Sequence, residues 1–189
     1  IDLINTGNNT TIAKRIFLVK KFVKSNDFIL LNGDAIFNFK IKKYYKDHVR
    51  SKNFITFLGC DAELSYGIVD LVKGNVKNFR RNAIFDKVQY SKQSKIISFV
   101  YSGISIMSKK LLNFSFKNSK NFEKEFYPHV IKKHKTGLRN INGFWHSIDN
   151  LKDIEDLNKS KNLIKFKKVF KLKNYILKGW FIDNEFLEK

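Results

Sequence analysis

The chain has 189 residues, 43% of them hydrophobic and 15% aromatic, and a formal net charge of +20 at pH 7. This length and apolar content are enough for one folded core, no apolar run is long enough for a membrane span, and the first residues do not resemble a signal peptide, so we expect a globular, cytoplasmic protein. The single cysteine, Cys60, excludes an intramolecular disulfide and a cysteine-based metal cluster, so a bound metal is expected on carboxylates.

The positive charge is carried mainly by lysine. Of the 37 basic residues, five are arginines: Arg15, Arg50, Arg80, Arg81 and Arg139. Asn, Ile and Phe are also abundant, and like lysine they have AT-rich codons. A nucleic-acid-binding groove would gather basic and aromatic residues on one element, whereas here lysine is scattered along the chain. We therefore expect no nucleic-acid partner, and an RNA-binding interpretation would rest on charge alone.

The first elements alternate between helix and strand patterns. Residues 11–23 place apolar side chains every three or four positions, which predicts an amphipathic helix capped by Thr10 or Thr11. Residues 28–31 form a continuous apolar run that is closed by Asn-Gly-Asp, as expected of a strand buried on both faces of a sheet. This alternation continues in the next segments.

The remaining elements are predicted from the same periodicities. In chain order they are a helix over residues 39–51, a buried strand over 54–60, β-rich stretches over 67–72, 76–79 and 96–107, a helix over 121–134, strands over 138–141 and 144–148, and a helix over 151–163. Turns are expected at residues 73–75 and around 93–94. Residues 165–173 alternate lysine with apolar residues, which favours an edge strand or an extended strap over a membrane-surface or RNA-binding tail.

This order of elements predicts an α/β fold. Strands that alternate with helices indicate a Rossmann-like, mixed and mostly parallel sheet flanked by helices. We expect one domain over residues 1–160 and a basic C-terminal extension over residues 161–189.

Two aspartates at predicted strand ends are candidates for chemistry. Asp34 follows the first buried strand, where open α/β sheets bind ligands, and Gly33 would let a ligand approach the backbone. Asp149 follows the strand predicted over residues 144–148. Paired carboxylates suit Mg²⁺, a hard cation that takes oxygen ligands. Each aspartate also has a purely structural interpretation. Asp34 would belong to a turn at Asn-Gly-Asp, and either Asp149 or Asn150 would cap the helix before Leu151; the pattern alone leaves these interpretations open.

Four motifs are similar to those of one enzyme family and occur in its order. They are Ile-Asp-Leu-Ile-Asn-Thr-Gly at 1–7 with Arg15-Ile16, Asn-Gly-Asp at 32–34, Ser-Tyr-Gly-Ile-Val-Asp-Leu at 65–71, and Gly-Phe-Trp-His-Ser-Ile-Asp-Asn-Leu-Lys-Asp at 143–153. The last resembles Gly-Phe-Trp-Gln-Pro-Met-Asp-Thr-Leu-Arg-Asp of the glucose-1-phosphate cytidylyltransferases. Over about residues 1–160 the chain resembles the sugar-1-phosphate nucleotidyltransferases.

The resemblance implies a fold, a reaction and a set of site residues. The fold would be of the nucleotide-diphospho-sugar transferase type, and the reaction would join a sugar 1-phosphate to the α-phosphate of a nucleoside triphosphate with release of pyrophosphate. The implied roles are Asp34 and Asp149 as catalytic Mg²⁺ ligands, Thr10, Arg15 and Gly33 at the nucleotide, and Tyr66, Gly67 and Glu123 at the sugar. For Glu123, a first-turn carboxylate that stabilises a helix is an equally good interpretation.

The chain also departs from the family pattern at four places. The Gly-rich N-terminal loop that grips the triphosphate is absent, so we expect a fragment that is inactive by itself. The family's Thr-Gly-Gly before the arginine becomes Ile-Ala-Lys at 12–14, and its sugar-site Asn-Gly-Gly becomes Tyr-Ser-Gly at 101–103. Its Glu-Lys-Pro, whose lysine meets the sugar phosphate, becomes Arg-Asn-Ala at 81–83, where Arg80, Arg81 or Lys87 would have to supply the cation.

Two functions from different classes follow. The first is nucleotidyl transfer, with CTP favoured and GTP, UTP or dTTP left open, that supplies precursors of surface polysaccharide or lipopolysaccharide. The second is a non-catalytic nucleotide-sugar-binding or regulatory relative that kept the scaffold. The sequence leaves homo-oligomerisation open.

Overall fold

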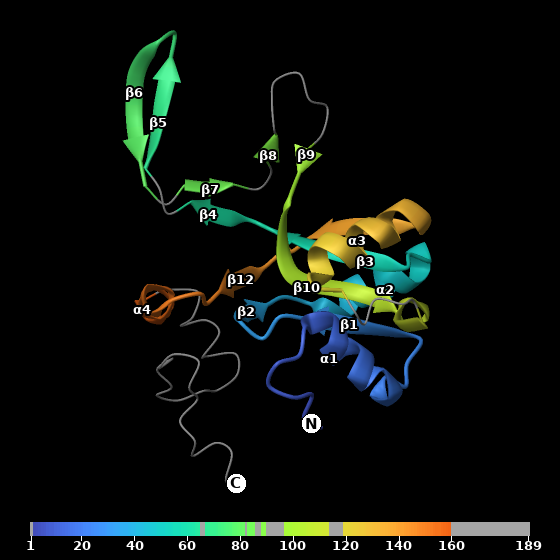
Figure 1. Ribbon diagram of the computed structural model, residues 1–189. Helices are drawn as coiled ribbons and strands as arrows, with labels where there is room; N and C mark the ends of the chain where they lie inside the picture. Colours follow the sequence, from blue (N-terminus) through green and yellow to red (C-terminus); the bar gives the residue numbers. More distant parts are fainter. Residues whose placement is uncertain are drawn as a thin grey trace. The chain divides into compact units, whose positions relative to one another are not determined.

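The computed structural model describes residues 2–64, 67–81, 83–85, 88–89, 97–113 and 119–159 (Figure 1). The chain divides into two compact units. The first contains Ile1–Leu31 and Ile41–Asn140, and the second contains Asn32–Lys40 and Ile141–Lys189. Within the described residues, no helix is long and apolar enough to cross a membrane. The predicted strand over residues 165–173 and the turn around residues 93–94 lie outside the described residues.

The first unit is built on a four-stranded sheet with the order β1-β10-β3-β11. Its strands are β1 (Asp27–Leu31), β3 (Ile55–Cys60), β10 (Val100–Ser108) and β11 (Thr136–Asn140). β10 pairs antiparallel with both β1 and β3, whereas β11 pairs parallel with β3. Three of the four strands therefore run in one direction, which confirms the predicted mixed, mostly parallel sheet.

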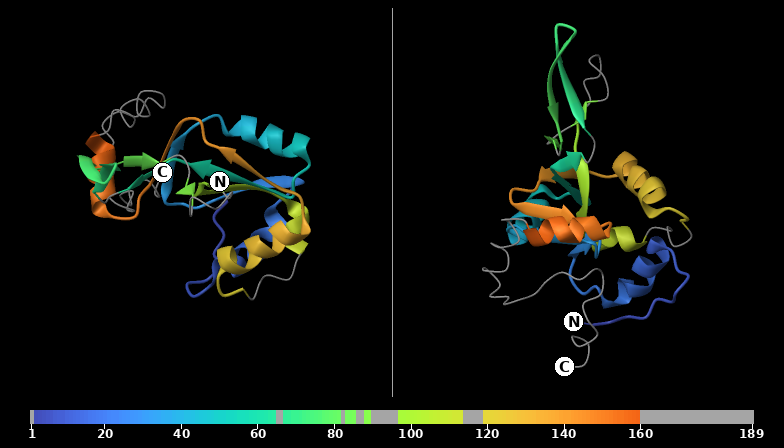
Figure 2. Two further views of the ribbon diagram at one scale, coloured as in Figure 1. Left: turned by 90° about the horizontal axis from the view of Figure 1, so that it is seen from above. Right: turned by 90° about the vertical axis from the view of Figure 1, so that its left-hand side faces the viewer.

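The alternation of side chains along β3 divides the core between the two faces of the sheet. Ile55 and Phe57 pack into the cluster that also contains residues of α1 (Ile12–Val19) and α3 (Phe122–Lys133). Thr56, between them, bonds instead to a side chain of α2 (Ile41–Ser51). This is the two-residue period of an extended strand. Figure 2 shows α1 and α3 on one face of the sheet and α2 on the other.

The face covered by α1 and α3 holds the larger apolar core. Its fully buried members are Ala13, Ile55, Met107, Leu111, Leu112 and Val130. Two aromatic helix residues, Phe122 and Phe126, stack at 4.7 Å between ring centroids. Burial of these side chains supplies the main driving force for docking the two helices on the sheet.

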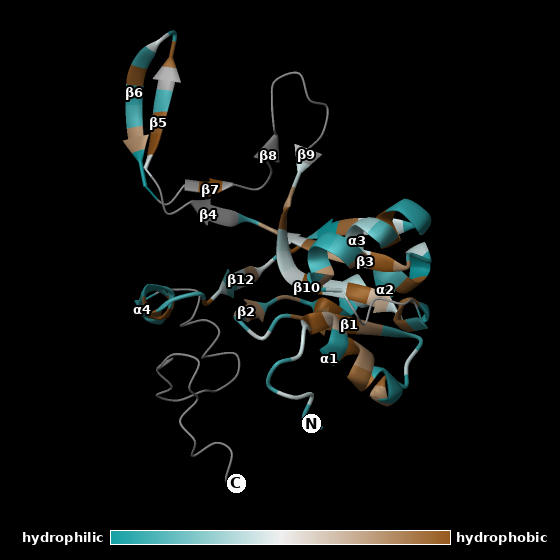
Figure 3. Cartoon of the chain, in the orientation of Figure 1, coloured by the Kyte–Doolittle hydropathy of each residue, from teal (hydrophilic) through white to brown (hydrophobic). Residues whose placement is uncertain are grey.

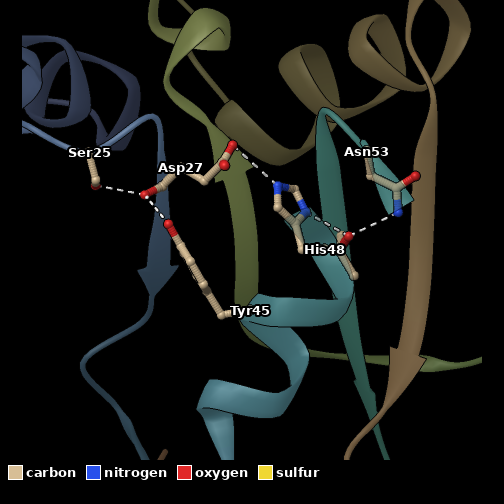
Figure 4. Close-up of polar contacts among 6 residues, drawn as sticks. Ser25, Asp27, Tyr45, His48 and Asn53 are labelled. Atoms are coloured by element: carbon tan, nitrogen blue, oxygen red, sulfur yellow. Dashed lines mark hydrogen bonds and ion pairs between the residues drawn. The ribbon is translucent and has the colours of Figure 1, made fainter. Parts of the chain in front are cut away.

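The other face holds a polar network around a buried histidine, His48 of α2 (Figure 4). Its Nδ1 lies 2.8 Å from the Thr56 hydroxyl of β3, which also accepts a hydrogen bond from the Asn53 amide at 3.1 Å. Its Nε2 lies 3.5 Å from a carboxylate oxygen of Asp27 in β1. The backbone carbonyl of Asp27 accepts from the Tyr45 hydroxyl at 3.1 Å. These contacts tie α2 to two strands of the sheet.

The other short strands of the first unit form three two-stranded ladders. They are β4 (Ala62–Leu64) with β7 (Ala83–Phe85), β5 (Ile68–Val72) with β6 (Asn75–Arg80), and β8 (Val88–Gln89) with β9 (Ile97–Ser98). The β5–β6 hairpin turns at Lys73 and Gly74, both of which have positive φ, as a type I′ turn requires. Figure 3 shows hydrophobic residues on both strands of this hairpin.

The second unit contains β2 (Ala35–Asn38), β12 (Phe144–Ser147) and α4 (Leu151–Lys159). β2 and β12 form a two-stranded antiparallel ladder. Gly143, just before β12, has a φ of 145°, and a Cβ there would lie 2.7 Å from the carbonyl oxygen of Asn38. The ladder therefore requires glycine at this position, both for its backbone conformation and for the close approach of the two segments of the chain.

The structure corrects several details of the sequence predictions. The strands β2, β4, β7 and β8 were not predicted. The strand over residues 28–31 is not buried on both faces, because no residue of β1 is fully buried and Leu31 is 45% exposed. In the helix over residues 11–23, α1 ends at Val19 and continues as a 3-10 turn, and Ile12 points out with 55% of its surface exposed.

Candidate functional site

Asp34 and Asp149 lie at the same end of the β2–β12 ladder. Asp34 is the residue before β2, and Asp149 comes two residues after β12. The ladder pairs Ala35 with Ser147, and one step further the Ile148 N–H donates to the carbonyl oxygen of Asp34 at 2.7 Å. The predicted convergence of these two aspartates is present in the backbone. It arises from an antiparallel ladder in the second unit, however, and not from the ends of two parallel strands as expected.

The turn after β12 is held by the carboxylate of a further aspartate, Asp153 of α4. One of its carboxylate oxygens accepts the backbone N–H groups of Asp149 at 2.8 Å and Asn150 at 3.0 Å. In return, the Asp153 N–H donates to the Asn150 side chain at 3.2 Å. This reciprocal pair has the geometry of a capping box. The predicted cap of this helix is therefore Asn150, and the Asp149 side chain has no share in it.

The Asp149 carboxylate itself is held by Ser147. The Ser147 hydroxyl donates to Oδ2 of Asp149 at 3.0 Å. Asp149 is exposed, and Asp34 is partly buried. One oxygen of Asp149 thus has a protein partner, while its position on the surface leaves the carboxylate accessible to a cation and to phosphate.

The donor set of this ladder end suits a hard divalent cation. Mg²⁺ commonly takes one or two carboxylates from a protein, while phosphate and water fill its other positions. The described part of the chain contains no group of three or more His, Cys, Asp or Glu side chains placed to hold a metal ion. Asp34 and Asp149 are candidates for such a site because their backbones meet at one end of the ladder.

Gly33 lies in open space beside Asp34. A Cβ built at this position has no heavy atom within 4 Å, and its φ is not in the left-handed region. Among the described residues, neither packing nor backbone conformation therefore requires glycine here. A small residue beside a candidate metal ligand is compatible with the close approach of a ligand to the backbone.

Thr10 and Arg15 contact each other in the first unit. The Arg15 Nε donates to the Thr10 hydroxyl at 3.2 Å, and that hydroxyl donates to the carbonyl of Gly7 at 3.0 Å. The next residue, Thr11, caps α1 by accepting the Lys14 N–H. Of the two predicted caps Thr11 is the correct one, and Thr10 instead orients the exposed Arg15.

Glu123 is exposed in the first turn of α3, near a pair of tyrosines of which Tyr127 is buried and Tyr101 is partly buried. The hydroxyls of Tyr101 and Tyr127 lie 3.0 Å apart. Burial raises the pKa of Tyr101 and of Tyr127, and the charge of Glu123 adds a smaller contribution in the same direction. Glu125, not Glu123, accepts the N–H of the cap residue Asn121 at 3.0 Å.

The other residues of the predicted sugar site are described only in part. Tyr66 lies outside the described residues, as do Asn82 and Lys87. The Phe79 ring lies against Gly67, where a Cβ would be 2.4 Å from its Cζ. Phe79 is 61% exposed and its ring can shift, so this contact alone does not require glycine. Arg80, a candidate cation for the sugar phosphate, donates through Nε to Asp70 at 2.8 Å.

Two residues of this site, Ser147 and Asp153, were missed from the sequence. Alternation along an extended chain places residues i and i+2 on the same side, which is the signal that could have paired Ser147 with Asp149. The Asn150-x-x-Asp153 spacing of a capping box was the corresponding signal for Asp153.

The chain is similar in sequence to one curated nucleotidyltransferase. It is 24% identical over 163 residues to a probable glucose-1-phosphate cytidylyltransferase of Bacillus subtilis, covering 86% of this chain and 60% of the relative. The chain thus spans less than two thirds of that relative's length. No protein-family model matches it.

Solved structures with the same fold include two of HddC from Yersinia pseudotuberculosis. The HddC complex with GMP-PN has a TM-score of 0.58 and 18% identity, over 88% of this chain and 67% of HddC. A second HddC structure has a TM-score of 0.50 and 18% identity, over 85% of this chain and 64% of HddC. The chain has the α/β fold expected of a nucleotide-diphospho-sugar transferase and is related to the sugar-1-phosphate nucleotidyltransferases.

Proposed function

We propose that the protein transfers a nucleotidyl group from a nucleoside triphosphate to a sugar 1-phosphate. The observation that carries this proposal is the convergence of Asp34 and Asp149 at one end of the β2–β12 ladder, within motifs that follow the order of the family. The similarity to a probable glucose-1-phosphate cytidylyltransferase supports the same activity.

The reaction needs positioning and neutralisation of charge more than a general base. A phosphate oxygen of the sugar 1-phosphate attacks the α-phosphorus, the bond from that phosphorus to the bridging oxygen breaks, and pyrophosphate leaves. Asp34 and Asp149 would hold Mg²⁺, which when bound supplies positive charge to the phosphate oxygens. Arg15, oriented by Thr10, would contact the nucleotide, and Gly33 would leave room for it. Tyr66, Gly67 and Glu123 would contact the sugar.

CTP is the nucleotide that we favour. The Asn-Thr-Gly and Gly-Phe-Trp motifs and the curated relative all point to a cytidylyltransferase. The HddC structure in complex with GMP-PN keeps a guanine nucleotide as the alternative. We further propose that the sugar nucleotide serves the synthesis of surface polysaccharide or lipopolysaccharide in the cytoplasm.

A non-catalytic relative that binds nucleotide sugars is the second candidate. It is favoured by the absence of the family's lysine motif, which in this chain is Arg-Asn-Ala at residues 81–83. Arg80, which could replace that lysine, is paired with Asp70. Retention of both aspartates opposes it, since a binding module gains little from paired metal ligands.

Release of pyrophosphate separates the two functions. The protein expressed from its complete gene is incubated with each of CTP, GTP, UTP and dTTP, together with a panel of sugar 1-phosphates and Mg²⁺, and the products are identified by mass. We expect pyrophosphate release that needs both substrates and is abolished by a chelator. Binding of nucleotide sugars without pyrophosphate from any pair would favour the non-catalytic relative.

A further inference from the structure

The hydroxyl of Ser147 contacts the candidate metal ligand Asp149 directly. It donates to Oδ2 of Asp149 at 3.0 Å. A hydrogen bond to an ionised acceptor is stronger than one between neutral groups, and here it engages only one of the two carboxylate oxygens. The other oxygen remains for a cation.

At the position of Ser147, the related family has a residue that could not make this contact. The motif Gly-Phe-Trp-Gln-Pro-Met-Asp of the cytidylyltransferases has proline where this chain has Ser147. Proline has no side-chain donor, so the hydroxyl contact is a property of this sequence and does not follow from the resemblance.

Hydrogen bonds already hold the backbone around Asp149. The contact with Ser147 therefore restrains the side-chain torsions of Asp149. The Ile148 N–H bonds to the Asp34 carbonyl and the Asp149 N–H bonds to the Asp153 carboxylate. Asp149 itself is exposed, and an exposed carboxylate without a partner samples several rotamers. The Ser147 hydroxyl selects one of them.

The carboxylates of Asp34, Asp149 and Asp153 have different surroundings. One oxygen of Asp153 accepts hydrogen bonds from two backbone N–H groups, and this residue belongs to the helix cap. Asp34 lies across the ladder, and its carbonyl is bonded to Ile148. Only Asp149 has its carboxylate aligned by a neutral hydroxyl, which does not compete with a cation for negative charge.

We propose that Ser147 is a positioning residue that orients the Asp149 carboxylate and thereby sets the affinity of the ladder end for a divalent cation. The proposal rests on the proposed function, because it takes Asp149 as a metal ligand. Partners of metal ligands outside the coordination sphere commonly change metal affinity by about 10–100-fold.

Three variants of Ser147 test this role. Ser147→Thr keeps the hydroxyl, Ser147→Val has the shape of threonine without it, and Ser147→Ala removes it with the least change in volume. Binding of Mn²⁺ by the full-length protein is measured by electron paramagnetic resonance, with Asp149→Asn as the reference for loss of a ligand. The Mg²⁺ concentration for half-maximal pyrophosphate release and the urea midpoint are measured on the same proteins.

The hydroxyl should govern metal binding. We expect Ser147→Ala and Ser147→Val to weaken Mn²⁺ binding about tenfold and to raise the required Mg²⁺ concentration, while Ser147→Thr stays close to wild type. The proposal would be overturned if Ser147→Ala and Ser147→Val bound Mn²⁺ as tightly as the wild type. A lower urea midpoint in these variants would not change that conclusion, because Ser147 would then have only a structural role. A wild-type protein that neither binds Mn²⁺ nor releases pyrophosphate would refute the proposed function, and this inference with it.

Discussion

At the scale of single residues, the contacts of His48 favour one neutral tautomer, with the ring proton on the nitrogen that faces Asp27. The Thr56 hydroxyl accepts from the Asn53 amide, so its own proton is available for Nδ1 of His48. The ring proton is then on Nε2, which faces the Asp27 carboxylate at 3.5 Å. At that distance the contact is electrostatic more than a hydrogen bond. In this tautomer Nδ1 accepts from Thr56, and Nε2 has the electrostatic contact with Asp27 but no hydrogen bond.

The pH dependence of stability follows from this neutral histidine. Burial lowers the pKa of His48 below its ordinary value of 6.5, against the opposing attraction of Asp27. The unfolded chain therefore binds the proton first as the pH falls, and the free energy of unfolding decreases below about pH 6.5. We expect the urea midpoint of the wild type to fall between pH 7.5 and pH 5.5 more steeply than that of His48→Gln. Equal slopes in the two proteins would contradict the neutral, buried histidine.

At the scale of elements, three helices begin at a side-chain cap. Thr11 accepts the Lys14 N–H at the start of α1, Asn121 accepts the Lys124 N–H at the start of α3, and Asn150 accepts the Asp153 N–H at the start of α4. In each case the acceptor satisfies an N–H group that has no partner within the helix. These caps fix where α1, α3 and α4 start.

The cap of α3 can be tested by substitution. Asn121 accepts the Lys124 N–H at 2.9 Å, and alanine would leave that group without its partner. We expect Asn121→Ala to lower the free energy of unfolding by about 1 kcal/mol, whereas Asn121→Asp should keep most of it because aspartate is an equally good cap. Urea unfolding monitored by circular dichroism measures both, and an unchanged midpoint for Asn121→Ala would show that the cap is dispensable.

Periodicity predicted the longer elements correctly. α2, α3, β3, β11 and β12 follow from their apolar spacing, and the β5–β6 turn follows from Lys-Gly at 73–74. β2 was not predicted because its four residues, Ala-Ile-Phe-Asn, do not alternate strictly between apolar and polar side chains. Its partner strand, β12, also lies more than a hundred residues later in the chain. Such a pairing depends on tertiary contacts, which local sequence does not encode.

The candidate site was predictable at the level of residues but not of contacts. Asp34 and Asp149 were selected from their position after apolar runs, and the backbone does bring them to one ladder end. The hydrogen bond from Ser147 depends on side-chain torsions, and the two-residue spacing alone does not distinguish it from an unrelated serine. The nucleotide and sugar roles of the other residues stay predictions.

At the scale of the whole molecule, the large positive charge alone does not identify the anionic partner. The net charge of +20 would attract any polyanion, but basic residues are spread over exposed positions of both units. Two of the arginines form ion pairs with nearby aspartates, Arg80 with Asp70 and Arg50 with Asp47. A general positive field favours anionic substrates such as nucleotides and sugar phosphates without specifying a nucleic acid.

The most direct measurement is the Mg²⁺-dependent pyrophosphate release of Asp34→Asn and Asp149→Asn in the full-length protein, with substrates found for the wild type. Asp156→Asn, an exposed carboxylate of α4, is the matched control, and circular dichroism verifies folding. We expect each of the two variants to lose at least about a hundredfold in rate, because removal of a metal ligand forfeits several kcal/mol of charge stabilisation, while the control stays at wild-type activity. Near-normal activity of Asp34→Asn or Asp149→Asn would contradict the role of this ladder end in nucleotidyl transfer.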